Sequence, residues 1–194
     1  MFTGIVEKIS KVTGVIDTPS FRRLGLALDF DVQPGQSIAV NGCCLTVAEI
    51  SPGGAVFDVI NETLAKTNLG LLEPGHEVNV ERSLKIGDRI DGHFVQGHVD
   101  GPAMLMEIAA GEKEYLLRLE AAAELAQYII PKGSVALDGV SLTVVKVSGN
   151  SFEVALIPTT LQSTTLGDKA RGYPFNLETD ILSKTVVSWL QRQK

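Results

Sequence analysis

Among the side chains of this sequence that could do chemistry, four stand out: the thiol of Cys44, the hydroxyl of Ser141, and the imidazoles of His93 and His98. A thiol or a hydroxyl can add to an electron-poor carbon of a heterocycle, or form a hydrogen bond beside it. Histidine titrates near neutral pH and suits general acid–base catalysis. Taken singly, each also has an ordinary structural interpretation, because free cysteine is often buried and a lone histidine is commonly a hydrogen-bonding group.

Cys44 and Ser141 occupy the same position in an internal repeat. Residues 37–47 and 134–144 align at an offset of 134 − 37 = 97, with six of the eleven positions identical. The same offset aligns three further pairs of segments, namely residues 63–64 with 160–161, 69–70 with 166–167, and 78–81 with 175–178. Near the start of each copy, residues 4–6 align with residues 97–99 at an offset of 93, so the second copy contains about four extra residues. These matches, all in the same order, indicate a duplicated domain.

Short strands must position the reactive side chains. Apolar or alternating runs at residues 37–40, 55–60 and 77–81 are separated by turn-forming clusters such as Gln33-Pro34-Gly35. Many short strands with regular turns are typical of all-β sandwiches and barrels, and a closed barrel leaves no sheet edge exposed. We therefore predict two small β-barrels, formed by residues 1–90 and 91–180, with the boundary near residues 85–89, where the strand pattern stops.

Two segments are predicted to be helical. Residues 120–130 are rich in alanine and indicate a short helix inserted in the second copy. Residues 181–194 have no counterpart after the first copy, and they place Leu182, Val186, Trp189 and Leu190 on one face at helical spacing. Because an apolar stripe needs a surface to pack on, we expect this terminal helix to mediate oligomerisation.

Composition excludes several classes of protein. The net charge of −6 argues against nucleic-acid binding, and no apolar run reaches the roughly 18 residues of a membrane span. The first residues have neither the basic region nor the apolar region of a signal peptide. The only cysteines, Cys43 and Cys44, are adjacent; they are poor candidates for a mutual disulfide and too few for a zinc site. We expect no bound metal, two free thiols and a cytoplasmic location.

The repeated motifs resemble those of riboflavin synthase of the α-chain type. The resemblance extends over essentially the whole chain. It rests on residues 1–6, on the paired segments 41–47 and 138–144, on residues 92–101, and on the paired segments 67–70 and 164–167. It implies two similar six-stranded Greek-key β-barrels and a C-terminal amphipathic α-helix that assembles a homotrimer. It leaves open an association with lumazine synthase.

The resemblance also implies an activity. Members of this family dismutate two molecules of 6,7-dimethyl-8-ribityllumazine by transferring a four-carbon unit, which yields riboflavin and 5-amino-6-ribitylamino-uracil in the last step of riboflavin biosynthesis. They need no cofactor beyond the substrate. The two lumazines of one site are held by the N-terminal barrel of one subunit and the C-terminal barrel of another. A reaction that joins two copies of one molecule suits two copies of one binding fold.

Carried over by position, the resemblance implies two sets of substrate-binding residues. We expect the first set to consist of Gly4, Ile5, Val6, Cys44, Leu45, Thr46, Asp58, Val59, Ile60, Asn61, Glu62 and Thr63. We expect the second set to consist of Gly97, His98, Val99, Lys132, Ser141, Leu142, Thr143, Ala155, Leu156, Ile157, Pro158, Thr159 and Thr160. Backbone amides and hydroxyls on short loops suit the polar edge of a pteridine and its ribityl chain.

The catalytic candidates are Cys44, His98, Ser141 and Thr143. His98 is favoured over His93 because it replaces Ile5 of the first copy inside a repeated Gly-x-Val triplet. We expect it to move protons, with the second barrel contributing more of the proton transfer. Which of Cys44 and Ser141 acts on the lumazine stays open. Phe2 either plugs a barrel end or stacks on the flat heterocycle.

Three alternative functions are compatible with parts of the sequence. A non-catalytic lumazine- or flavin-binding antenna protein would have the same fold, but the presence of His98, Lys132, Ser141 and Thr143 favours the enzyme. A flavin-reductase barrel is disfavoured, because Pro174 interrupts the nearest flavin-binding string and no Gly-x-Gly-x-x-Gly segment follows. A purely structural trimer module would not need two such motifs.

Overall fold

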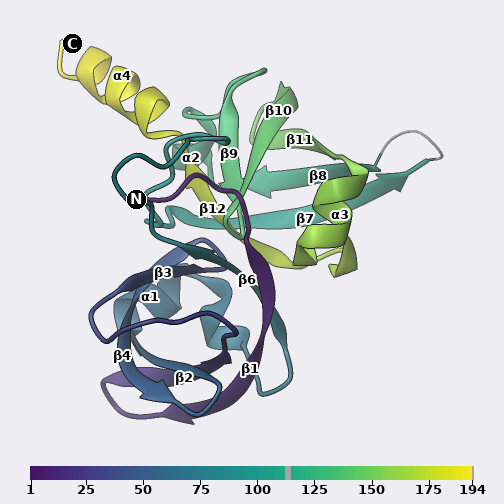
Figure 1. Ribbon diagram of the computed structural model, residues 1–194. Helices are drawn as coiled ribbons and strands as arrows, with labels where there is room; N and C mark the ends of the chain where they lie inside the picture. Colours follow the sequence, from purple (N-terminus) through teal and green to yellow (C-terminus); the bar gives the residue numbers. More distant parts are fainter. Residues whose placement is uncertain (112–114, 194) are drawn as a thin grey trace.

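A computed structural model of the protein describes residues 1–111 and 115–193, and it contains two closed β-barrels in tandem followed by a C-terminal helix (Figure 1). The first barrel comprises β1 (Lys8–Asp17), β2 (Phe21–Ala27), β3 (Ser37–Val40), β4 (Cys43–Ser51), β5 (Gly54–Ile60) and β6 (Glu77–Arg82). The second comprises β7 (Gly101–Ala110), β8 (Tyr115–Ala121), β9 (Ser134–Leu137), β10 (Val140–Ser148), β11 (Ser151–Leu156) and β12 (Pro174–Thr179).

The two barrels have the same topology. The first closes in the order β1-β2-β5-β4-β3-β6 and the second in the corresponding order β7-β8-β11-β10-β9-β12, with antiparallel pairing throughout. Each connection from the fifth to the sixth strand forms two short helices, α1 (Asn61–Lys66) and η1 (Asn68–Leu71) in the first copy, and α3 (Pro158–Ser163) and η2 (Thr165–Asp168) in the second. The predicted all-β fold of two six-stranded barrels is confirmed.

The extra residues of the second copy lie mainly between β8 and β9. The strands β1 and β7 begin 101 − 8 = 93 residues apart, β2 and β8 begin 115 − 21 = 94 apart, and β3 and β9 begin 134 − 37 = 97 apart. The predicted helix over residues 120–130 is wrong in extent, because only α2 (Ala123–Ala126) is helical. Ala121 instead pairs with Ala103 in the sheet and is buried, so sheet packing overrides the helix propensity of alanine.

The alternation of side chains along a strand decides which residues face outward. In β4, Leu45 points into the core of the first barrel, whereas Cys44 and Thr46 point away from it. In β10, Leu142 is buried in the same way, and Ser141 and Thr143 point outward. The reactive side chains therefore lie on the outside of the barrels.

The barrels contact each other through matched hairpin turns. Asn41-Gly42 connects β3 to β4 and Asp138-Gly139 connects β9 to β10, and Asn41 and Asp138 have the same φ of 44°. Positive φ at both residues identifies type I′ turns. A Cβ atom added to Gly42 would lie 2.5 Å from the nitrogen of Gly139, and one added to Gly139 would lie 2.8 Å from the nitrogen of Gly42. The two turns therefore pack backbone against backbone, at a pseudo-two-fold axis that relates the barrels.

A buried hydrogen-bond network surrounds these turns and follows the same pseudo-symmetry. The Asn176 amide donates to the carbonyl of Asn41 over 2.8 Å, and the matched Asn79 amide donates to the carbonyl of Asp138 over 3.0 Å. The side-chain oxygens of the same two asparagines accept backbone N–H bonds of 2.7 and 2.9 Å from the short helices of the opposite barrel. These reciprocal bonds hold the two barrels in one arrangement.

Asp138 breaks the symmetry of this network. Its carboxylate accepts hydrogen bonds from the Asn68 amide (2.8 Å), the Asn176 N–H (2.8 Å) and the Tyr173 hydroxyl (3.0 Å). Asp138 is fully buried, and burial raises the pKa of its carboxyl to about 6 despite these bonds. The matched residue of the first copy, Asn41, is uncharged.

Replacing Asp138 by Asn is therefore expected to stabilise the protein above pH 6. A folded-state pKa raised above the unfolded value means that the stabilising contribution of Asp138 is present below about pH 4 and is lost as the pH rises through about 6. The Asn variant removes the cost of the buried charge, by up to about 3 kcal/mol at pH 8, and the difference should vanish near pH 4. Thermal unfolding of both proteins between pH 4 and 8 measures this. The exposed Asp31→Asn is the control, and a pH-independent difference would contradict the expectation.

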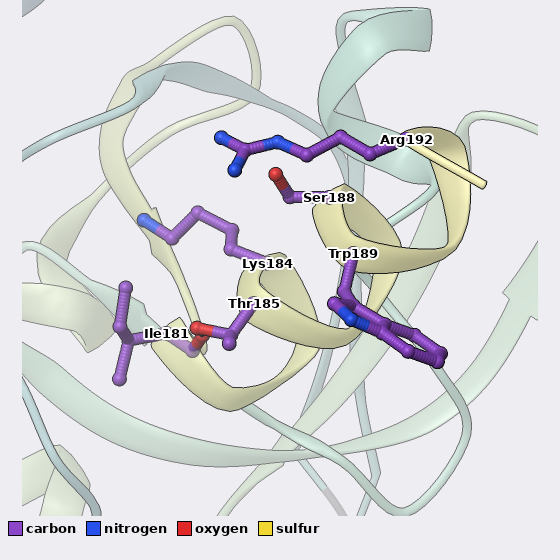
Figure 2. A pocket seen from close by; sticks show the side chains of 6 residues that line it. All are labelled: Ile181, Lys184, Thr185, Ser188, Trp189 and Arg192. Atoms are coloured by element: carbon purple, nitrogen blue, oxygen red, sulfur yellow. The ribbon is translucent and has the colours of Figure 1, made fainter.

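The C-terminal helix α4 (Ile181–Gln191) extends away from the second barrel (Figure 1). Asp180 caps it by accepting the Leu182 N–H over 2.9 Å, and Lys184 anchors its first turns through two contacts of 2.9 Å with the carboxylate of Asp100. None of its residues is buried, and the apolar side chains predicted to form a stripe are 52–61% exposed; they are Leu182, Val186, Trp189 and Leu190. Figure 2 shows six side chains along this helix that line a shallow cavity of about 420 Å³.

None of the helices in the described part of the chain is both long enough and apolar enough to span a membrane.

Candidate functional site

The segment of residues 97–99 lies against the first barrel, although it leads into the second barrel. The Cys44 N–H donates to the Gly97 carbonyl over 2.8 Å, and Val99 packs against the core of the first barrel. Gly97 has a φ of 78°, and a Cβ atom there would lie 2.6 Å from the Cβ of Cys44. Only glycine fits this close approach.

The N-terminal segment, residues 4–6, makes the reverse crossing: it leads into the first barrel but lies against the second. The Ser141 N–H donates to the Gly4 carbonyl over 2.7 Å, and Val6 packs against the core of the second barrel. Gly4 has a φ of 76°, and a Cβ atom there would lie 2.7 Å from the Cβ of Ser141. The two crossing segments thus make matched contacts on opposite barrels.

This arrangement corrects the expected grouping of the binding segments. The expectation placed Gly4, Ile5 and Val6 with Cys44, and Gly97, His98 and Val99 with Ser141. The structure exchanges these segments between the barrels, because the bridge between Phe2 and Val95 crosses the junction and directs each segment onto the other barrel. The repeat alignment could not reveal this, since it shows which residues are equivalent and not which are neighbours.

We call the first of the resulting sites the Cys44 site. Its cavity, of about 280 Å³, lies between β4, α1 and the crossing segment, and its lining consists of Cys43, Cys44, Glu62, Thr63, Lys66, Thr67, Gly97, His98 and Val99. His98 is exposed and lines this cavity together with the half-buried Cys44. An acid–base group and a thiol therefore lie at one cavity, on the first barrel.

The two thiols of the site differ in environment. Both cysteines are free. Burial raises the pKa of the Cys43 thiol to about 12, so this thiol stays protonated and acts as a small apolar residue of the core. Cys44, which points outward, is the thiol that a ligand could reach.

We call the second site the Ser141 site. It consists of Ser141 with the residues that pack over it, namely Gly4, Gly92 and His93. The Nδ1 atom of His93 lies 2.8 Å from the Ser141 hydroxyl, and burial lowers the pKa of the imidazole, which favours its neutral form. Its Nε2 atom is buried without a hydrogen-bond partner among residues 1–111 and 115–193. His93, which the sequence had ranked below His98, is thus the histidine of the Ser141 site.

At the ends of β5 and β11, the side chains alternate between the core and the surface. Val59 and Leu156 are core residues of their barrels, whereas Ile60 and Ile157 are 56% and 61% exposed. Asp58 and Ala155 also face outward; Asp58 forms a 3.0 Å ion pair with Arg23. In the connections that follow, Asn61, Pro158 and Thr159 are exposed and Thr160 is partly buried. The buried members of the predicted set could meet a ligand only through their backbone.

Two predicted residues lie elsewhere. Phe2 is fully buried in a small apolar cluster between the barrels, next to Ala39 and Ala136, so the structure supports the plug and not the stacking surface. Lys132 is exposed in the turn before β9 and is not among the residues that line the Cys44 cavity. Its backbone has a φ of 66°, which costs a residue other than glycine about 1–2 kcal/mol, and the matched residue of the first copy is Gly35.

Within residues 1–111 and 115–193, no three His, Cys, Asp or Glu side chains are grouped so that they could hold a metal ion.

Comparison with known proteins identifies the class to which this fold and these sites belong. The family model described as "Lumazine binding domain" matches residues 3–83 and again residues 96–180, one match for each barrel. The crystal structure of LumP complexed with riboflavin superposes with a TM-score of 0.84 at 27% identity, covering 92% of this chain and 99% of the other. That of LumP complexed with 6,7-dimethyl-8-(1'-D-ribityl) lumazine gives a TM-score of 0.83 at 26% identity, with the same coverage. The protein is therefore a tandem lumazine-binding-domain protein.

Relatives that match nearly the whole chain identify the family within this class. Riboflavin synthase of Mycobacterium bovis is 45% identical over 193 residues, which cover 96% of each chain. Riboflavin synthase of Escherichia coli is 41% identical over 197 residues, covering 99% of this chain and 92% of the relative. The chain belongs to the riboflavin synthase family, as the repeated motifs had indicated.

Proposed function

We propose that this protein is a riboflavin synthase. It converts two molecules of 6,7-dimethyl-8-ribityllumazine into riboflavin and 5-amino-6-ribitylamino-uracil by moving a four-carbon unit from one lumazine to the other. The observation that supports this most directly is the pair of equivalent sites, which offer different reactive groups at the matched positions Cys44 and Ser141. Two equivalent sites suit two identical substrates, and their different groups suit unequal roles as donor and acceptor.

The reaction needs no further reactant. The four carbons lost by one lumazine become the new ring carbons of riboflavin, so the two substrates together contain all the atoms of the two products. The contribution asked of the protein is therefore orientation and proton transfer. Orientation of well-placed reactants contributes on the order of 7–11 kcal/mol to lowering a barrier.

The Cys44 site would supply an acid–base group beside a thiol. His98 lies in the lining of the same cavity as Cys44 and is exposed there. Its imidazole can take the acidic proton of a lumazine 7-methyl group, or return a proton during ring closure. The Cys44 thiol would add to, or form a hydrogen bond beside, the electron-poor C7 position.

The Ser141 site would act on the second lumazine. The contact between His93 and the Ser141 hydroxyl can polarise that hydroxyl, because a neutral imidazole accepts a proton from it. Thr143 follows on the same outward face of β10 and offers a further hydroxyl to the ribityl chain or the ring edge.

Assembly would complete the site. The exposed apolar side chains of α4 support an oligomerisation helix, and we propose a homotrimer in which the Cys44 site of one subunit meets the Ser141 site of another. The exposed Lys132, held in a strained turn, is proposed to contact lumazine in such a composite site. The free thiols fit the reducing cytoplasm, where we place the protein. A complex with lumazine synthase would deliver the substrate directly, and co-elution of the two proteins tests it.

Purified protein given only the lumazine is expected to release riboflavin and the pyrimidine in equal amounts. The reaction is balanced without a co-reactant, so neither metal nor nucleotide should increase the yield. Flavin absorbance and chromatography of the products measure it. Tight binding of the lumazine without turnover would contradict the enzyme and favour a binding protein, as the similarity to LumP would then indicate.

A further inference from the structure

Two buried glutamates hold the crossing segments through hydrogen bonds to their backbone. Glu81 in β6 and Glu178 in β12 are matched by the repeat, since 178 − 81 = 97, and they are 6% and 3% exposed. The carboxylate of Glu178 accepts the Gln96 N–H over 2.6 Å and the Gly97 N–H over 2.9 Å. A buried carboxylate with these bonds is directed entirely at the segment that carries His98.

Glu81 makes the equivalent contacts with the N-terminal segment. One oxygen accepts the N–H and the hydroxyl of Thr3 over 2.7 and 2.9 Å, and the other accepts the Gly4 N–H over 3.1 Å. Burial raises the pKa of both glutamates, and the backbone N–H donors act against this by favouring the ionised form.

Each crossing glycine is therefore held from two sides. Its N–H is bound by the glutamate of its own barrel, and its carbonyl accepts the N–H of Cys44 or Ser141 in the other barrel. An ionised carboxylate suits this position because it only accepts hydrogen bonds, and each group hydrogen-bonded to it is a donor. A glutamine has one accepting oxygen, and its NH₂ group would face a backbone N–H.

We infer that Glu81 and Glu178 are positioning residues that act across the barrel junction, Glu81 of the first barrel on the Ser141 site and Glu178 of the second barrel on the Cys44 site. The inference rests on the proposed function, because it assigns the two glutamates to lumazine binding. It predicts that each glutamate affects the site that lies on the other barrel.

The test compares Glu81→Gln and Glu178→Gln with the unaltered chain and with Glu77→Gln, an exposed residue of the same strand as Glu81. Riboflavin, which is not consumed, serves as the ligand in fluorescence titrations and in hydrogen–deuterium exchange. We expect Glu178→Gln to weaken riboflavin binding at one of two sites by about tenfold, the effect of one unpaired buried N–H. It should also speed the exchange of the backbone amides of residues 96–98, and riboflavin should no longer protect these amides. Amides elsewhere should exchange as in the unaltered chain.

Glu81→Gln should produce the same changes at the other site and in residues 3–5 alone, and Glu77→Gln should produce neither. Equal weakening of both sites by each variant, or unchanged exchange in both segments, would overturn the inference. If the unaltered chain binds no riboflavin and makes none from the lumazine, the proposed function fails instead. The exchange of residues 3–5 and 96–98 in the free proteins then still tests whether the glutamates hold the segments.

Discussion

Replacing His98 by Gln is expected to lower turnover by about 10²–10⁴-fold while the affinity for the lumazine changes by only a few-fold. Glutamine keeps the capacity for hydrogen bonding and removes the imidazole, which can take up and release a proton. His98 is exposed in the lining of the Cys44 cavity, where a bound lumazine would meet it. Steady-state turnover and ligand titration of the same preparation measure the two effects separately.

Two further variants separate the contribution of His98 from those of Cys44 and His93. Cys44→Ser retains a small polar group in the same cavity and should cost less than the loss of the imidazole. His93→Gln should also cost less, because His93 acts through the Ser141 hydroxyl and its Nε2 atom is enclosed. Near-normal turnover of His98→Gln together with an inactive Cys44→Ser would show that the thiol, and not the imidazole, leads the chemistry of the Cys44 site.

Ending the chain at Asp180 is expected to give a monomer whose turnover falls by about 10²-fold or more, because the two lumazines would no longer be held in one site. The truncation removes α4, none of whose residues is buried within its own chain. Burying its apolar face between subunits stabilises an assembly at roughly 25 cal/mol per Å² of apolar surface. Light scattering gives the oligomeric state, and turnover is measured at the same concentration.

The barrels should survive this truncation, because both cores lie before residue 180. Circular dichroism and retained riboflavin binding would show that they do. Trp189→Ser offers a milder variant, which should dissociate at a higher protein concentration than the unaltered chain. A truncated monomer with full turnover would exclude a site formed between subunits.

The repeat made most of the fold predictable. Strands and short helices from residue 37 onward recur at an offset of 97, so one alignment locates nearly every element of both barrels. The exception was the alanine-rich segment at residues 120–130, where β8 takes Glu120 and Ala121. The alanine-rich composition favoured a helix there, but Glu120 and Ala121 extend β8 and pair with its neighbouring strands.

The sequence predicted many of the residues that form the sites, but it did not predict which of them lie together. Cys44, Ser141 and His98 were found from residue type and position in the repeat, but the exchange of the glycine segments depends on contacts between residues about 50 to 140 positions apart. The role of Glu81 had a visible signal, because Glu81 and Glu178 are acidic residues at matched positions of the repeat, each directly after an apolar residue. His93 was identified by its residue type but ranked below His98, because it lies outside the aligned triplets.

The reciprocal crossing of the two glycine segments also bears on how such a chain could have evolved. Before the duplication, a single barrel would have had a glycine segment that binds a neighbouring barrel. It would also have had a strand, equivalent to β4 and β10, that binds the glycine segment of the neighbour. Such a barrel would complete its site only in a symmetric pair of identical copies, and the pseudo-two-fold axis of the present chain has the geometry that fusion of such a pair would leave. As long as the copies came from one gene, both sites had to be identical. Fusion freed each half to mutate alone, which allowed Cys44 and Ser141, or Asn41 and Asp138, to diverge.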